Sequence, residues 1–130
     1  MNSKSSMRTP LGHVRGLGSA RSGTGHFWMQ RVTAVANVIL ATAFLVIVIS
    51  LVGKPYSQAM ALLSHPVVAL LMLLFVVSGL IHMRLGMQTI IEDYVHGEAV
   101  KVLAVMGNTF FTVAVGAASI FAILKIAFGG

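Results

Sequence analysis

Three long apolar stretches, separated by short polar segments, restrict this 130-residue chain to one kind of fold. An α-helix rises about 1.5 Å per residue, so about 20 apolar residues cross a hydrocarbon core of about 30 Å. Backbone polar groups in lipid must be hydrogen-bonded within the protein, a condition that helices satisfy. We therefore predict an all-α integral membrane protein with three transmembrane helices, over residues 28–52, 66–94 and 102–125.

Composition supports this prediction and limits the chemistry. Hydrophobic residues make up 57% of the chain and charged residues only 9%, whereas a water-soluble domain is about 25% charged. The absence of cysteine excludes disulfides, thiolate-bound iron–sulfur clusters and cysteine nucleophiles within the chain. Any electron carrier that it holds must therefore be bound by other side chains.

Residues 1–25 are predicted to form a basic, irregular N-terminal arm, followed by a membrane anchor over 26–130. The arm is rich in Gly, Ser and Arg and has no periodic apolar pattern. It lacks the apolar core of a secretory signal peptide, although its acid-free, Arg-rich start is also typical of a mitochondrial presequence. We expect contact with anionic membrane lipid rather than with nucleic acid, because no nucleic-acid-binding signature accompanies the charge.

The distribution of Lys and Arg predicts the orientation, because loops rich in these residues stay inside. The N-terminus is expected inside and the C-terminus outside, which places Asp93 and Tyr94 on the inner side. The inner side then carries Lys4, Arg8, Arg15, Arg21, Arg31, Arg84 and Lys101, and the outer side carries Lys54 and Lys125.

The segment HMRLGMQTIIEDY, residues 82–94, holds the strongest candidates for a functional site. A helix turns about 100° per residue, so His82, Gly86 and Asp93 share one face, with Asp93 about 16 Å beyond His82. An imidazole within an apolar helix is a candidate haem ligand, and a glycine one turn away leaves room for a porphyrin. A structural hydrogen bond and proton transfer remain alternatives for His82.

Asp93 and Tyr94 lie where the same helix meets water, and an acid beside a phenol can hydrogen-bond the carbonyl of a redox-active lipid. The alternatives are a solvated helix end and an interfacial tyrosine. Arg31, at the start of the first span, is either a snorkelling anchor or the partner of an anionic cofactor group. Arg84 lies about 200° from His82 around the helix and is predicted to snorkel, with a contact to a haem propionate as the alternative.

A six-coordinate haem needs two axial ligands, and His82 provides one. His65 is expected near the outer surface, whereas His13, His26 and His96 are expected near or beyond the inner one. The second ligand would therefore come from another chain.

The remaining polar residues of the spans are predicted to support packing. Asn37 is expected to hydrogen-bond a neighbouring helix, and Asn108, Thr109 and Thr112 their own backbone or a neighbour. The segment 54–65 is predicted to be a short loop that ends at Pro66, a favoured first residue of a helix.

The stretch HMRLGMQTIIEDYVHGEA, residues 82–99, resembles the small hydrophobic membrane anchor of succinate dehydrogenase (succinate:quinone oxidoreductase, respiratory complex II). The H-x-x-x-G-M and D-Y-V elements occur in that family at this separation. The stretch HFWMQRVTAVAN, residues 26–37, is similar to the segment that enters the family's first span. The resemblance covers residues 26–130 and includes the topology of three helices with the N-terminus inside.

The resemblance implies a function and a role for each candidate residue. His82 would be one axial ligand of haem b, and a second membrane anchor would supply the other. Tyr94 would donate a hydrogen bond to ubiquinone, with Asp93 supporting the site or its proton supply, while Arg31 and Gly86 would border the haem propionates or pocket. Electrons from succinate would arrive through a flavoprotein subunit and an iron–sulfur subunit.

The expected location is the inner membrane of a bacterium, with the mitochondrial inner membrane as the alternative. Two other functions remain open. A cofactor-free structural anchor would need no ligand at His82, and a small transporter would need a carboxylate within the membrane. The chain's only acids are Glu92, Asp93 and Glu98, which cluster at helix ends, so transport is disfavoured.

Overall fold

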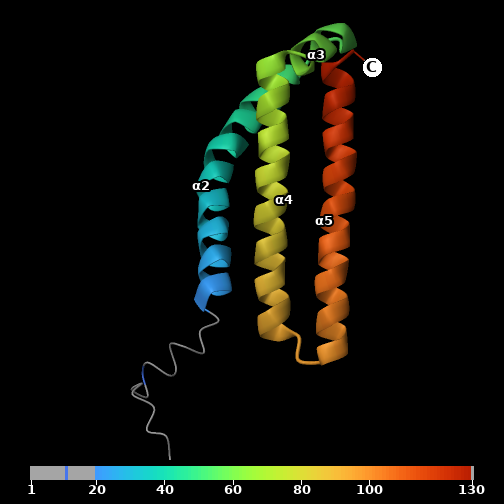
Figure 1. The fold of residues 1–130 in the computed structure, drawn as a ribbon. Coiled ribbons are helices and arrows are strands. Elements are labelled where there is room, and N and C mark those ends of the chain that lie inside the picture. The colour runs from blue at the N-terminus through green and yellow to red at the C-terminus, as the bar shows by residue number, and fades with distance from the viewer. Residues whose placement is uncertain (1–10, 12–19, 130) are drawn as a thin grey trace, which may run out of the picture.

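The computed structural model describes residue 11 and residues 20–129. This part of the chain is helical throughout, apart from short connections, and contains no strand. Its elements are α2 (Ala20–Leu51), α3 (Tyr56–Leu63), α4 (Pro66–Tyr94) and α5 (Glu98–Ala127) (Figure 1).

Three of these helices are long and apolar enough to cross a membrane, over Gly23–Leu51, Pro66–Tyr94 and Glu98–Ala127. This confirms the prediction of an all-α fold with three spans. The second span has the predicted bounds. The others extend beyond the predicted limits, because a formed helix lengthens at little cost into polar residues at its ends.

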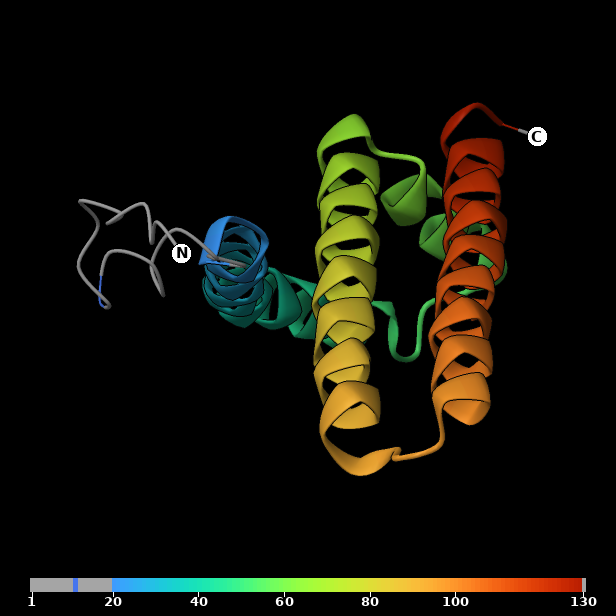
Figure 2. The same ribbon diagram turned by 60° about the horizontal axis from the view of Figure 1, so that its bottom comes forward.

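Helix α4 lies between α2 and α5 and packs against both (Figure 1). In Figure 2 the first part of α2 is seen almost end-on while α4 and α5 run from top to bottom of the view, so this part of α2 is inclined to the other two helices. Only Ile47, Ala69, Leu85 and Ile91 are buried hydrophobic residues in the described part. Nearly the whole apolar surface therefore faces outward, as expected where lipid or neighbouring helices cover it.

Two predicted boundaries were wrong. The irregular arm was expected to reach Gly25, but α2 begins at Ala20, so residues 20–25 extend the first helix. Residues 1–10 and 12–19 of the arm lie outside the described part. The predicted loop 54–65 contains α3, whose sequence YSQAMALL is rich in helix-forming residues. The carbonyl of Pro55 accepts hydrogen bonds from Gln58 and Ala59 and so begins that helix.

Polar side chains join α4 to its neighbours as predicted. Asn37 Nδ2 of α2 donates to the carbonyl of Ser78 at 3.5 Å, and Asn108 Nδ2 of α5 donates to the carbonyl of Arg84 at 3.0 Å. Arg84 Nε in turn donates to Thr109 Oγ1 at 3.4 Å. Arg84 therefore faces α5, whereas His82 contacts α2 as described below.

Of the glycines in α5, Gly116 has the tighter contact with α4. A Cβ atom at this position would lie 3.1 Å from Leu80 Cδ1, whereas one at Gly107 of the same helix would meet nothing within 4 Å. We expect Gly116→Val to destabilise the folded chain by about 1–3 kcal/mol more than Gly107→Val, because only the former overpacks an interface. Thermal unfolding of both variants in detergent tests this, and equal melting temperatures would contradict it.

Candidate functional site

The imidazole of His82 is held on the face of α4 that packs against α2. Its Nδ1 lies 3.1 Å from Thr33 Oγ1 and 3.2 Å from the backbone carbonyl oxygen of Gln30. Gln30 and Thr33 are three residues apart in α2, so one helical face brings both groups to the histidine. Thr33 is among the most buried residues, with 5% of its surface exposed.

The contact with the Gln30 carbonyl favours one tautomer of the His82 ring. A carbonyl oxygen only accepts hydrogen bonds, so the contact with Gln30 requires a proton on Nδ1 of His82. The Thr33 hydroxyl donates to the carbonyl of Met29 at 2.7 Å and can accept from the same Nδ1–H. The Nε2 atom of neutral His82 then presents a lone pair, and it forms no hydrogen bond with the described residues. An imidazole oriented in this way is prepared to bind a metal.

A cavity of about 350 Å³ lies beside His82, between α2 and α4. Two buried polar atoms at this site, His26 Nε2 and Gln30 Oε1, have no hydrogen-bond partner in the described part of the chain. Leaving a buried polar atom unpaired costs about 1–3 kcal/mol, so both atoms are available to a water molecule or a ligand in the cavity. The cavity is lined by Gly23, His26, Phe27, Gln30, Arg31, Ala34, His82 and Thr89.

Arg31 supplies the positive charge of this cavity. Its guanidinium carbon lies 4.3 Å from the centre of the Phe27 ring, a cation–π contact that holds the side chain along α2. No carboxylate lines the cavity. The site therefore favours a ligand with an anionic group near Arg31.

Gly86 faces α2 as well. A Cβ atom on Gly86 would lie 3.4 Å from Gln30 Nε2, an ordinary contact distance, so the Gln30 side chain packs beside this glycine. Gly86 does not line the cavity beside His82, and its place in a haem pocket stays a prediction.

Asp93 and Tyr94 lie in the last turn of α4, and both are exposed. Tyr94 has 76% of its surface exposed. Neither residue lines the cavity beside His82, which Thr89 reaches from the same helix. Their side chains form no hydrogen bond within the described residues, which leaves them accessible to a ligand or a partner at the helix end. Their quinone-binding role stays a prediction.

Several residues of the site were missed from the sequence. Thr33 and Gln30 lie 49 and 52 residues from His82 and reach it only because α2 packs on α4. His26 was expected near or beyond the inner surface, with its contact to haem left open, and it lines the same cavity as His82. Residues 26, 30 and 34 are spaced four apart and so lie on one face of a helix. This spacing would predict that they line one site, but only if the helix is known to begin before residue 26.

Comparison with known proteins gives a consistent result. Residues 5–121 match the family model described as succinate dehydrogenase/fumarate reductase transmembrane subunit. The succinate dehydrogenase hydrophobic membrane anchor subunit of Paracoccus denitrificans is 36% identical over 121 residues, which cover 93% of each chain. No significant match to a solved structure was found.

More distant relatives carry related names. The succinate dehydrogenase hydrophobic membrane anchor subunit of Rickettsia bellii is 29% identical over 83% of this chain and 93% of its own length. The succinate dehydrogenase membrane anchor subunit of Reclinomonas americana is 34% identical over 65% of this chain and 73% of its own. With three apolar spans and a family match over most of its length, this chain belongs to the family of succinate dehydrogenase/fumarate reductase transmembrane subunits, as a succinate dehydrogenase membrane anchor.

Proposed function

We propose that this anchor supplies one axial ligand of haem b, through His82, and part of the site at which ubiquinone is reduced. The observation that carries the proposal is the hydrogen bonding of His82. Its Nδ1 is engaged by Gln30 and Thr33, which leaves the Nε2 lone pair available beside a cavity. In a cofactor-free anchor the same hydrogen bonds would serve only to pack α2 on α4.

The residues around His82 fit a haem group. His82 Nε2 would bind the iron, the Arg31 guanidinium would pair with a propionate, and the unpaired His26 Nε2 offers a further contact for a propionate oxygen. When bound, haem b supplies a centre that accepts and returns one electron. The protein contributes the orientation of the ligand and the cationic side chain near the anionic groups.

The second axial ligand would come from the companion membrane anchor. His65 caps the N-terminus of α4, where its Nδ1 accepts from the amide of Val67 at 3.2 Å, at the far end of the helix from Tyr94. His96 is exposed beyond the end of α4. His26 borders the same cavity as His82 but belongs to the propionate side of the proposed site.

Tyr94 and Asp93 would bind ubiquinone where α4 meets the aqueous phase. The Tyr94 hydroxyl would donate a hydrogen bond to a quinone carbonyl oxygen, and the Asp93 carboxylate would hold the proton supply close to it. Reduction of ubiquinone to ubiquinol takes two electrons and two protons. The exposure of both side chains allows protons to arrive from water without crossing the membrane.

The electrons would come from succinate, which is oxidised on the flavin of a soluble flavoprotein subunit and linked to the membrane by an iron–sulfur subunit. The anchor would hold these subunits at the inner face of a bacterial inner membrane, together with the second anchor. An inside N-terminus puts Asp93, Tyr94 and the α4–α5 connection on that face. This chain is thus one part of an oxidoreductase and does not catalyse succinate oxidation itself.

Thr33→Val tests the proposed role of the His82 hydrogen bonds. Valine keeps the shape of threonine but removes the hydroxyl that faces His82 Nδ1. We expect haem retention in the purified complex to fall about tenfold and the haem midpoint potential to shift, as for changes around other metal ligands.

Thr42→Val is the matched control. The Thr42 hydroxyl donates to the carbonyl of Val38 in its own helix at 2.8 Å, as that of Thr33 does to Met29, but it contacts no histidine. This variant should keep both the haem content and the potential of the wild type. Equal effects of the two substitutions, or no effect of either, would contradict the role assigned to Thr33.

A further inference from the structure

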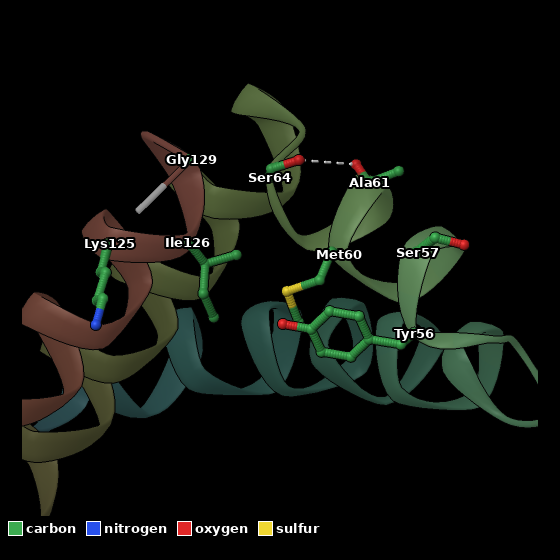
Figure 3. A pocket seen from close by; sticks show the side chains of 8 residues that line it. All are labelled: Tyr56, Ser57, Met60, Ala61, Ser64, Lys125, Ile126 and Gly129. Carbon is green, nitrogen blue, oxygen red and sulfur yellow. Dashed lines mark hydrogen bonds between the residues drawn. The ribbon is translucent and has the colours of Figure 1, made fainter.

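A second cavity lies at the other end of the spans from Tyr94. It has a volume of about 680 Å³, within the range of about 300–1,000 Å³ that is usual for small-molecule sites. Figure 3 shows the Tyr56 ring and the Met60 side chain reaching from α3 toward Ile126 and Lys125 of α5. The cavity is lined by Tyr56, Ser57, Met60, Ala61, Ser64, Lys125, Ile126 and Gly129.

Lys125 brings a positive charge to this cavity. Lys125 is exposed and forms no ion pair or hydrogen bond with the described residues. The three acidic side chains of the chain, Glu92, Asp93 and Glu98, lie at the far end of α4 and the start of α5, so none of them lines this cavity. Electrostatic complementarity therefore favours an anion beside Lys125.

The first turn of α3 adds to this preference. Tyr56 and Ser57, its first two residues, line the cavity, and Pro55 at the N-cap makes no side-chain capping hydrogen bond. A helix N-terminus carries partial positive charge on amide groups that have no partner within the helix. This effect acts in the same direction as the charge of Lys125.

An apolar groove of about 260 Å³ adjoins the cavity and shares Ser64 with it. Leu70 and Leu73 lie one to two turns inside α4, and Leu124 lies one turn inside α5, so the groove extends from the helix ends toward the membrane interior. A cationic compartment at the helix ends that continues into an apolar groove matches a molecule with an anionic head and an acyl tail. The groove is lined by Ser64, Pro66, Ala69, Leu70, Leu73, Leu124, Ala127 and Phe128.

We propose that this composite site binds one anionic phospholipid, with its phosphate paired to Lys125 and an acyl chain in the groove between α4 and α5. The short helix α3 lies across this end of the molecule, as an interfacial helix does (Figure 1). The exposed Tyr56 has the amphipathic character typical of the headgroup level. With the N-terminus inside, the lipid belongs to the outer leaflet.

The test is native mass spectrometry of the purified whole complex, equilibrated with phosphatidylglycerol. Removing one lysine charge near a membrane surface costs about 1 kcal/mol or more, so Lys125→Gln should lower retention of the lipid about five- to tenfold. Lys125→Arg should restore retention. Lys54→Gln is the matched control, because it removes a charge at the same end of the molecule but does not line the cavity.

A second variant separates the lipid from free phosphate. Ala127→Phe fills the groove without changing any charge. It should therefore lower the retention of phosphatidylglycerol, whereas any binding of inorganic phosphate at Lys125 should be unchanged. Unchanged lipid retention in Lys125→Gln, or an equal loss in Lys54→Gln, would overturn the proposal. Displacement of the lipid by millimolar inorganic phosphate, or crosslinking of a probe at position 125 to another subunit rather than to lipid, would also overturn it.

Discussion

His82→Ala is expected to abolish the low-spin b-type spectrum of the purified complex or to shift it to a high-spin form. The substitution removes the imidazole that α2 holds through Nδ1 and that lines the cavity. Changes that merely touch the partners of a metal ligand lower affinity about 10- to 100-fold, so loss of the ligand itself should have at least that effect. Absorbance spectra and haem content per complex measure it.

His96→Ala is the matched control for this experiment. His96 is exposed beyond the end of α4 and lines no described cavity, so its removal should leave the spectrum unchanged. The helices should insert normally in both variants, because His82 contacts one face of α2 and Phe44 still stacks on Phe75 with ring centres 4.7 Å apart. A wild-type low-spin spectrum in His82→Ala would refute the ligand assignment.

Tyr94→Phe should lower succinate-dependent ubiquinone reduction about 10- to 100-fold, the effect expected when a hydrogen bond to a developing negative charge is removed. Succinate oxidation with a soluble artificial acceptor should be unchanged, because that reaction does not use the membrane site. The ratio of the two activities is the measurement. The high exposure of Tyr94 makes a folding defect from loss of one hydroxyl group implausible.

Tyr56→Phe provides the control for Tyr94→Phe. These are the chain's two tyrosines, and Tyr56 lies at the opposite end of the spans. Its hydroxyl should make no difference to quinone reduction. Equal loss of both activities in Tyr94→Phe would indicate failed assembly, and full quinone reduction in that variant would remove Tyr94 from the site.

The three spans could be predicted from the sequence because lipid imposes a simple condition on them. A helix that must cross about 30 Å of hydrocarbon needs a continuous apolar stretch, and the span expected over about 66–94 coincides with the helix Pro66–Tyr94. Helix α3 was missed because eight residues between two spans carry no such condition. Its formation depends on local propensity and on the start that Pro55 provides, which are weak signals.

The candidate site was predictable only in part, for a related reason. His82 stands out in sequence because a polar ring within an apolar span is costly. Its partners do not, since Thr33 and Gln30 are ordinary residues that become important through the rotation of α2 against α4. The position of Gly86 illustrates the same limit, because the helix face could be predicted but not that Gln30 would occupy the space.

The orientation of His82 also explains why the site is open on one side. The described part of the chain packs α2 and α4 around the imidazole, and the proposal assigns His26, the other histidine at this cavity, to the propionate side. An exposed apolar surface on all three spans leaves room for helices of a companion anchor. The proposed haem would thus lie between two chains and depend on both.

The most direct test of this account is the reduced-minus-oxidised visible spectrum of the chain purified with and without its companion membrane anchor. The account predicts a low-spin b-type spectrum that appears only when both anchors are present, because His82 supplies one of two axial ligands. A complex that retains all its subunits and yet contains no haem would contradict it and leave the hydrogen bonds of His82 as packing interactions alone.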